Sequence, residues 1–309
     1  MLTIDTHQHV FPEAYRKMLD DTGRMTGGIG EAPKWSPTLA LEFMDRFEIG
    51  TGMLSTPVPS FGSVKDASYW ARSVNEAGAA AVASSPSRFG YLATIPMADM
   101  DSALEETRYA FDVLHADGVV LMASTGGVYL GDASLTPLME ELNTRSAVIF
   151  VHPGDLPGPA VPTIPPFAAD FLLDTTRAAI NLILAHTLDE CPNLRIILAH
   201  AGGFLPYIIY RILPMLAGGN IDRTDEVLAG LKRFYFDLAL SSSPTALPSL
   251  LAFADHTHIT FGSDWPAAPE DVVRFFGNEF EKYPFDPDLR YAIGRGNAER
   301  LFPRLGAAG

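Results

Sequence analysis

Four histidines and one aspartate in this 309-residue chain stand where short apolar runs end. They are His7, His9, His152, His200 and Asp264. Side chains two positions apart on a β-strand point to the same face, so His7 and His9 are expected to share one. Imidazoles together with a carboxylate bind zinc and other divalent transition metals. A single His-x-His pair arises by chance, but five suitable residues at strand ends predict a metal site.

The apolar runs that precede these residues are typical of buried β-strands. The eight runs are Leu2–Ile4, Met53–Ser55, Phe89–Ile95, Val119–Met122, Ala147–Val151, Arg195–Ala199, Phe234–Leu240 and Ile259–Phe261. They are nearly continuous rather than alternating, which is the pattern of parallel strands that are buried on both faces. Helical patterns separate them. Ser36-Pro37 is typical of a helix start, and a longer helix is predicted over 168–188.

Eight strands that alternate with helices in a chain of this length predict one (β/α)₈ barrel domain over residues 1–309. An open doubly wound sheet is the other fold to weigh. That fold needs a glycine-rich phosphate-binding turn after the first strand, and His7-Gln8-His9 stands there instead. Barrel active sites form at the carboxyl ends of the strands, where the candidate ligands lie.

Two long connections follow predicted strands and are interpreted as lids over the site. Residues 10–35 include a glycine-rich turn, and residues 153–166 contain six prolines. Loops of this length usually have a function, although irregular connections are the other interpretation.

The composition excludes several classes of protein. The chain has 22 Lys and Arg against 37 Asp and Glu, a net charge of −15, which argues against a nucleic-acid partner and against an anionic membrane surface. No apolar run reaches transmembrane length. A single cysteine, Cys191, excludes an intrachain disulfide and a thiolate metal cluster. The start of the chain has no signal-like segment, so a cytoplasmic protein is expected.

The motifs around the candidate ligands resemble the amidohydrolase superfamily of metal-dependent barrels. The resemblance rests on Ile4-Asp5-Thr6-His7-Gln8-His9 together with His152, His200 and Asp264. Further motifs narrow it to the branch that holds aminocarboxymuconate-semialdehyde decarboxylase and the hydroxybenzoate decarboxylases. These motifs are Phe150–Pro153, Leu198–Pro206, Gly262–Pro266 and Gly296–Ala298. Pro33–Ser36 and Met44–Arg46 resemble the methylsalicylate decarboxylases of that branch.

This resemblance implies that four residues hold one divalent metal: His7, His9, His152 and Asp264. It also implies that His200 acts as an acid or base beside the metal. Many members of the superfamily hold two metals, bridged by a carbamylated lysine at the end of the fourth strand. The segment after the fourth predicted strand, Ala123–Gly127, has no lysine, which favours a single metal. The histidine-rich set favours zinc, and manganese is the alternative.

The branch implies a non-oxidative decarboxylase of a small aromatic acid, an ortho-hydroxybenzoate such as methylsalicylate. The ring carbon must be protonated before carbon dioxide leaves, and either His200 or Asp264 is the acid. Hydrolysis of a lactone or amide would use the same residues with metal-bound water as nucleophile, and a hydratase is a third possibility. A non-catalytic barrel would be expected to have lost one of the five residues.

An acidic protein that binds an anion needs local positive charge besides the metal. Arg211 matches an arginine that reaches the neighbouring subunit's site in the semialdehyde decarboxylases, which implies a homodimer; a surface arginine is the other interpretation. Glu31 stands where those enzymes carry a carboxylate-binding arginine, which argues against their dicarboxylate substrate. Lys34 is interpreted either as a substitute cation or as a solvated loop lysine.

Aromatic residues near these motifs are interpreted as the wall of a substrate pocket. They are Trp35, Phe61 and Trp265, and ordinary packing is the other interpretation for each one taken alone. Asp237 ends the seventh predicted strand and is expected to face the same mouth, either as a site residue or as the partner of a buried donor.

Overall fold

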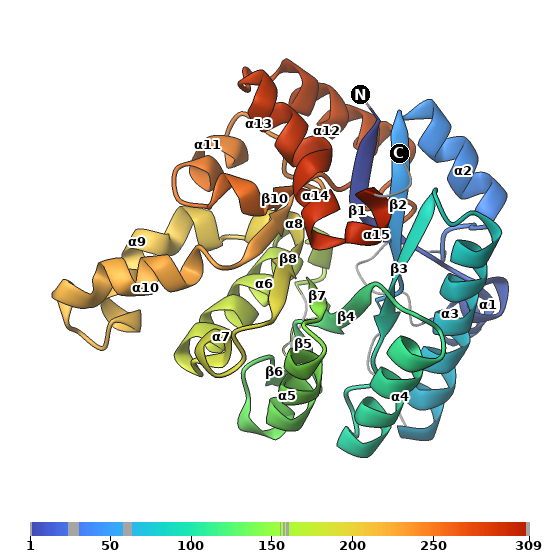
Figure 1. Ribbon diagram of the computed structural model, residues 1–309, viewed down its shortest axis with the longest axis horizontal. Helices are drawn as coiled ribbons and strands as arrows, with labels where there is room; N and C mark the ends of the chain where they lie inside the picture. The colour runs from blue at the N-terminus through green and yellow to red at the C-terminus, as the bar shows by residue number, and fades with distance from the viewer. Residues whose placement is uncertain are drawn as a thin grey trace.

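The structure, a computed structural model, describes residues 2–23, 31–57, 64–154, 156, 158 and 161–306. Eight parallel strands form its central sheet, with helices on the outside (Figure 1). In their order around the sheet they are β1 (Thr3–His9), β2 (Ile49–Ser55), β3 (Phe89–Thr94), β4 (Gly118–Met122), β7 (Val148–His152), β8 (Arg195–Leu198), β9 (Tyr235–Asp237) and β10 (Ile259–Thr260). Because the spatial order follows the chain order, each crossover places a new strand beside the previous one.

Contacts between the last strand and the first close the sheet into a barrel. The backbone N–H of Thr6 in β1 donates to the carbonyl of Phe261, just after β10, over 2.9 Å. The hydroxyls of Thr6 and Thr260 lie 2.8 Å apart. The predicted (β/α)₈ barrel is therefore confirmed.

The connections between the barrel strands are mostly helical. The helices are α1 (Glu13–Thr22), α2 (Pro37–Arg46), α3 (Val64–Ser84), α4 (Met100–Asp112), α5 (Thr136–Thr144), α6 (Pro166–Leu184), α7 (Thr187–Glu190), α8 (Ala199–Gly202), α9 (Leu205–Leu216), α10 (Thr224–Leu231), α11 (Ala246–Leu251), α12 (Glu270–Lys282), α13 (Pro287–Tyr291), α14 (Asn297–Leu301) and α15 (Pro303–Gly306). A small antiparallel hairpin, β5 (Ser124–Thr125) and β6 (Val128–Tyr129), follows β4. None of the described helices combines the length and apolarity that crossing a membrane requires.

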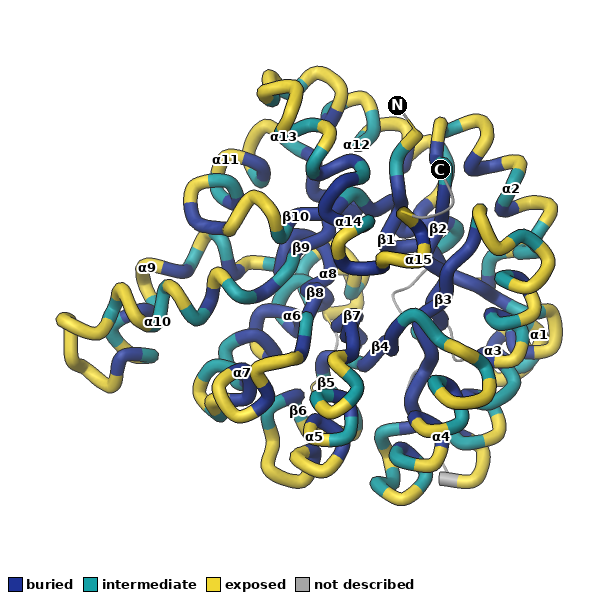
Figure 2. The backbone as a smooth tube through the Cα atoms, in the orientation of Figure 1, coloured by how far each residue is buried: buried dark blue, intermediate teal, exposed yellow. Residues whose placement is uncertain are grey.

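Both faces of the barrel strands are buried, which explains their continuous apolar runs. The inner faces bring Met53, Leu92 and Phe150 together inside the barrel, and Leu301 and Phe302 near the C-terminus pack against them. The outer faces pack against the surrounding helices. Figure 2 shows this arrangement as a buried centre surrounded by helices with exposed outer surfaces.

The predicted helix starts and ends agree with the structure in part. Helix α2 begins at Pro37, and the Ser36 hydroxyl accepts the backbone N–H of Leu39 over 3.2 Å. The prediction of one helix over 168–188 is wrong at its end. Helix α6 stops at Leu184, and His186 then adopts a left-handed φ of 53° before α7 begins.

The first predicted lid, residues 10–35, is not a loop throughout because α1 occupies Glu13–Thr22. Its buried residues, Tyr15 and Leu19, lie one helical turn apart on the same face. The second predicted lid, residues 153–166, leads into α6. Residues 24–30, 155, 157, 159 and 160 lie outside the described part of the chain, and the lid function of both segments stays a prediction.

Gly203, in the turn between α8 and α9, provides a test of the packing behind the site. Its φ is 66°, and an added Cβ would lie 2.1 Å from the carbonyl oxygen of Leu172. We expect Gly203→Ala to lower the free energy of unfolding by about 2–4 kcal/mol, measured by urea denaturation. Gly230→Ala in α10 is the control, because nothing lies within 4 Å of its added Cβ and alanine favours a helix. Equal stability of the two variants would contradict this packing.

Candidate metal centre

Strand β1 carries the first two candidate ligands to the mouth of the barrel. His7 and His9 are fully buried, with ring centroids 5.0 Å apart. The pairing of β1 with β2 shifts register between Asp5 and Gln8. Asp5 stabilises this irregular segment, since its carboxylate accepts the backbone N–H of His7 at 3.0 Å and the side-chain amide of Gln8 at 2.9 Å. It also accepts the Ser263 backbone and hydroxyl, at 3.0 and 2.5 Å, and so links β1 to the segment after β10.

The other two candidate ligands come from distant parts of the chain. His152 ends β7, and Asp264 follows β10. The Oδ1 atom of Asp264 lies 2.9 Å from His9 Nε2 and 3.3 Å from His7 Nε2. The ring of His152 lies 5.3 Å from that of His7 and 5.0 Å from that of His9. One ligand atom from each of the four residues lies within 4.8 Å of the others, so the structure brings the four predicted ligands together.

The outer nitrogen, Nδ1, of each of these histidines has an oxygen partner on a different part of the barrel. The partners are Asp237 Oδ1 at 3.2 Å from His7, the Ser55 hydroxyl at 3.2 Å from His9 and the Pro153 carbonyl at 2.8 Å from His152. Carboxylate and carbonyl oxygens only accept, and the Ser55 hydroxyl donates its own hydrogen to the Gln8 carbonyl while the Ser55 carbonyl also lies 3.3 Å from His9 Nδ1. Nδ1–H therefore donates outward in each ring, and Nε2 is directed toward the centre.

Two of these inward-facing nitrogens lack a hydrogen bond. His7 Nε2 and His152 Nε2 are buried and have no hydrogen-bond partner among the described residues. A buried polar atom without a partner is costly, and a divalent cation at the centre would bind both. Three imidazole nitrogens and one carboxylate form a donor set that fits zinc or another divalent transition metal.

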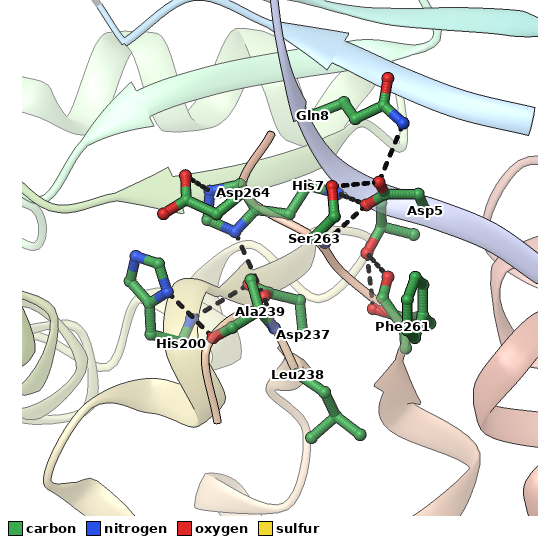
Figure 3. Close-up of polar contacts among 12 residues, drawn as sticks. Asp5, His7, Gln8, His200, Asp237, Leu238, Ala239, Phe261, Ser263 and Asp264 are labelled. Atoms are coloured by element: carbon green, nitrogen blue, oxygen red, sulfur yellow. Dashed lines mark hydrogen bonds and ion pairs between the residues drawn. The ribbon is translucent and has the colours of Figure 1, made fainter. Parts of the chain in front are cut away.

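His200 lies beside these four residues but is not one of them. It belongs to the short α8 and has a left-handed φ of 54°. Its Nδ1 lies 3.1 Å from the carbonyl of Ala239 (Figure 3). Its ring centroid is 4.9 Å from that of His7 and 6.2 Å from that of His152. Because Nδ1 is engaged, Nε2 is the ring nitrogen left to act in the cavity that His200 lines.

Burial and two carboxylates determine the charges at the centre. Burial opposes a charge on His7, but Asp237 and Asp264 outweigh it and raise the pKa of His7 to about 10. Burial alone would raise the pKa of Asp264, but the charge on His7 and the close approach of His7 Nε2 and His9 Nε2, at 3.3 and 2.9 Å, hold that pKa well below its ordinary value. Burial lowers the pKa of His9, and that of His152 well below the ordinary value. The centre therefore favours a positive charge between its carboxylates, and a divalent cation satisfies the same requirement.

A cavity of about 400 Å³ opens over the cluster. His9, His152, His200 and Asp264 all line it. Its other lining residues are mainly apolar and include Phe11, Tyr15, Leu19, Phe167, Phe171 and Val272. The sequence pattern around the strand ends does not single out these residues, because most of them lie on helices. Spacings of four residues, Tyr15 to Leu19 and Phe167 to Phe171, are the signal that one face of α1 and one face of α6 are apolar.

The residues predicted to bind substrate are not among the described residues that line this cavity. Trp265 stacks on an aromatic ring of α2, with centroids 4.6 Å apart. Trp35 packs beside α1, and Lys34 and Arg211 are exposed. Phe61 lies outside the described residues. The substrate roles of these five residues stay predictions.

The family model described as amidohydrolase matches residues 4–304. This chain belongs to the amidohydrolase family. A relative named 6-methylsalicylic acid decarboxylase, from Penicillium expansum, is 36% identical to this amidohydrolase over 316 residues, which cover 99% of the chain and 97% of the relative. The predicted family is therefore confirmed.

Two solved structures resemble this amidohydrolase over almost their whole length. A crystal structure described as an amidohydrolase II has a TM-score of 0.91 and 29% sequence identity, and the match covers 97% of this chain and 99% of that one. A dihydroxybenzoic acid decarboxylase from Polaromonas sp. JS666, with bound manganese and the inhibitor 2-nitroresorcinol, has a TM-score of 0.82 at 22% identity. That match covers 98% of this chain and 97% of that one, and shows a shared fold.

Loss of one inward-facing nitrogen should weaken metal binding. We expect His152→Ala to lower the affinity for zinc or manganese by more than about 100-fold, since removal of even an outer partner of a ligand costs about 10–100-fold. The affinity is measured by chelator competition, and metal content by elemental analysis after dialysis. His256→Ala, which changes an exposed histidine, is the control and should bind one metal per chain. Unchanged affinity in His152→Ala would contradict the assignment.

Proposed function

We propose that this amidohydrolase is a metal-dependent, non-oxidative decarboxylase of an ortho-hydroxybenzoate. The observation that carries the proposal is the placement of His200 beside four clustered metal-type donors, three of which line a mainly apolar cavity together with His200. The Penicillium expansum relative is named for decarboxylation of 6-methylsalicylic acid, and it matches nearly the whole chain. A monocyclic hydroxybenzoate of that kind is therefore the proposed substrate class.

The proposed ligands are His7, His9, His152 and Asp264, and the proposed ion is zinc. Three imidazoles with one carboxylate suit zinc, whereas manganese prefers a larger share of oxygen ligands. The manganese in the Polaromonas protein makes that metal the alternative. A divalent ion held here supplies Lewis-acid stabilisation of negative charge on the carboxylate and ortho-hydroxyl oxygens of the substrate.

The cavity walls orient the aromatic ring. Phe11, Phe171 and Val272 offer apolar surface from three separate segments, so a flat ring with an alkyl substituent can be buried between them. Burial of the ring excludes water from the reacting carbon and holds that carbon near the base of the cavity.

His200 is the proposed proton donor. The low pKa of Asp264 keeps its carboxylate ionised, which suits a metal ligand rather than an acid. Protonated His200 gives the Nε2 proton to the ring carbon that bears the carboxylate. The bond from that carbon to the carboxylate then breaks, its electron pair returns to the ring, and carbon dioxide leaves. The Ala239 carbonyl keeps the imidazole in place during this transfer, and water then reprotonates Nε2.

The proposal is tested by loading metal-stripped protein with zinc or manganese and offering a panel of hydroxybenzoates, lactones and amides. We expect metal-dependent release of carbon dioxide from 6-methylsalicylate, with the corresponding phenol as the other product. Cleavage of a lactone or amide without carbon dioxide would overturn the decarboxylase proposal and indicate a hydrolase on the same site. Decarboxylation that persists in chelated protein would overturn metal dependence.

Substitution of His200 separates proton transfer from metal binding. We expect His200→Asn to lower kcat by about 100-fold or more, because a general acid contributes about 10²–10⁴-fold. Metal content should stay at the wild-type level, since His200 is not among the four clustered donors. Loss of metal from this variant would show that His200 is a ligand and contradict the division of roles.

We also propose a homodimer that is formed through α9. Helix α9 lies at the outer edge of the molecule (Figure 1). It carries Tyr207 and Tyr210, which are 85% and 71% exposed, and the exposed Arg211 follows Tyr210 in the chain. Large exposed aromatic side chains are common at protein interfaces. In the proposed dimer Arg211 supplies positive charge at the partner subunit's cavity.

The dimer is tested by light scattering on the wild type and on Tyr210→Asp. We expect a wild-type mass of twice the 33.5 kDa chain, and the single-chain mass for the variant because a buried, unpaired charge opposes association. Arg211→Ala should keep the dimer and raise KM for the carboxylate substrate. A wild-type protein that stays monomeric at assay concentration would contradict the proposal.

A further inference from the structure

Asp237 contacts both functional parts of the candidate site. It ends β9 and is fully buried. Its Oδ1 lies 3.2 Å from His7 Nδ1 and accepts a 2.7 Å bond from the backbone N–H of Ala239. Its Oδ2 accepts a 3.1 Å bond from the backbone N–H of His200 (Figure 3). One carboxylate therefore joins a proposed metal ligand to the proposed acid.

We propose that Asp237 is a positioning residue that fixes the ring of His7 toward the metal and the place of His200 beside it. The inference rests on the proposed function, because it assigns His7 to the metal and His200 to proton transfer. Asp237 acts through these two residues and does not itself hold the ion. Both of its oxygens already accept N–H donors, which favours this role over ligation.

The contact with His7 selects one form of the imidazole. Both oxygens of Asp237 already accept a backbone N–H, so the carboxylate acts as an acceptor toward His7 as well, which places the hydrogen on Nδ1 and leaves Nε2 for the centre. A carboxylate behind a ligand histidine also makes the ring a stronger donor to a metal. Asp237 is the only carboxylate that an outer nitrogen of the three clustered histidines contacts among the described residues, since His9 and His152 use neutral oxygens.

The hydrogen bond from the His200 backbone N–H to Asp237 stabilises an unfavourable backbone conformation at His200. His200 and Ala201 have φ values of 54° and 55°, in the left-handed region that is unfavourable for a non-glycine residue. Residues 237–239, at the end of β9 and just after it, contact His200 at two points. Asp237 accepts the backbone N–H of His200, and the Ala239 carbonyl accepts its Nδ1–H. The orientation of His200 toward the cavity therefore depends on the position of residues 237–239.

Packing leaves little space for the carboxylate to move. A Cβ added at Gly262 would lie 2.8 Å from Asp237 Oδ1 and 2.9 Å from His7 Cβ. The segment after β10 therefore packs directly against the contact between Asp237 and His7.

The test is Asp237→Asn, which keeps the size of the side chain. An asparagine has one acceptor oxygen, so its NH₂ group must face N–H donors either at His7 and Ala239 or at His200. We expect zinc affinity to fall by about 10–100-fold, measured by chelator competition. In zinc-loaded protein labelled with ¹⁵N-histidine, the hydrogen-bonded Nδ1–H signal of His7 should shift or disappear. These two measurements do not require turnover.

Glu106→Gln is the matched control for the loss of a buried carboxylate. Glu106 is 4% exposed in α4 and accepts bonds from Arg72 at 2.8 Å and Asn75 at 2.7 Å. We expect this variant to lose stability but to keep wild-type zinc affinity and the wild-type His7 signal. A purely structural Asp237 would behave like Glu106.

The outcomes separate this inference from the proposed function. If the wild type binds zinc, and Asp237→Asn keeps that affinity and the His7 signal, the positioning role is wrong while the metal site stands. If the wild type binds no divalent metal, the proposed function fails and the positioning role fails with it. Reduced affinity with a changed His7 signal in Asp237→Asn, and neither change in Glu106→Gln, supports the inference.

Discussion

Burial of three imidazoles around one ionised carboxylate is the constraint on which this site depends. Polar groups without partners are costly in such a place, so each ring must satisfy its outer nitrogen elsewhere. The partners are an aspartate, a serine hydroxyl and a backbone carbonyl from different parts of the barrel. With the outer nitrogens satisfied, the inner ones and Asp264 face one another, and a cation at their centre is the chemistry that this arrangement fits best.

The same contacts close the barrel and build the site. Asp264 donates its backbone N–H to the carbonyl of His7, and His9 donates to the carbonyl of Trp265, each over 2.8 Å. Asp5 adds side-chain bonds from β1 to Ser263. The pairing of β1 with the segment after β10 therefore brings His7 and His9 close to Asp264. Folding stability and metal binding are therefore coupled. If β1 separated from the segment after β10, His7 and His9 would move away from Asp264 and the metal site would be lost.

The barrel and the five candidate residues at its mouth follow from the sequence because both depend on local patterns, whereas the division into four ligands and His200 came from the family resemblance. Continuous apolar runs identify strands buried on both faces, and parallel strands bring their carboxyl ends to one mouth. The left-handed backbone of His200, the double contact of Asp237 and the cavity walls from α1 and α6 depend on tertiary packing. No local pattern specifies which helix faces cover the mouth, so lining residues on α1 and α6 such as Tyr15 and Phe171 were not predicted.

The most direct test of the metal centre is anomalous X-ray diffraction from crystals of protein loaded with zinc or manganese, recorded at the absorption edge of the metal. A single peak bonded to His7, His9, His152 and Asp264, with His200 beyond bonding distance, is the result that this account predicts. A peak elsewhere, a second metal at the mouth, or a bond from His200 to the ion would contradict it.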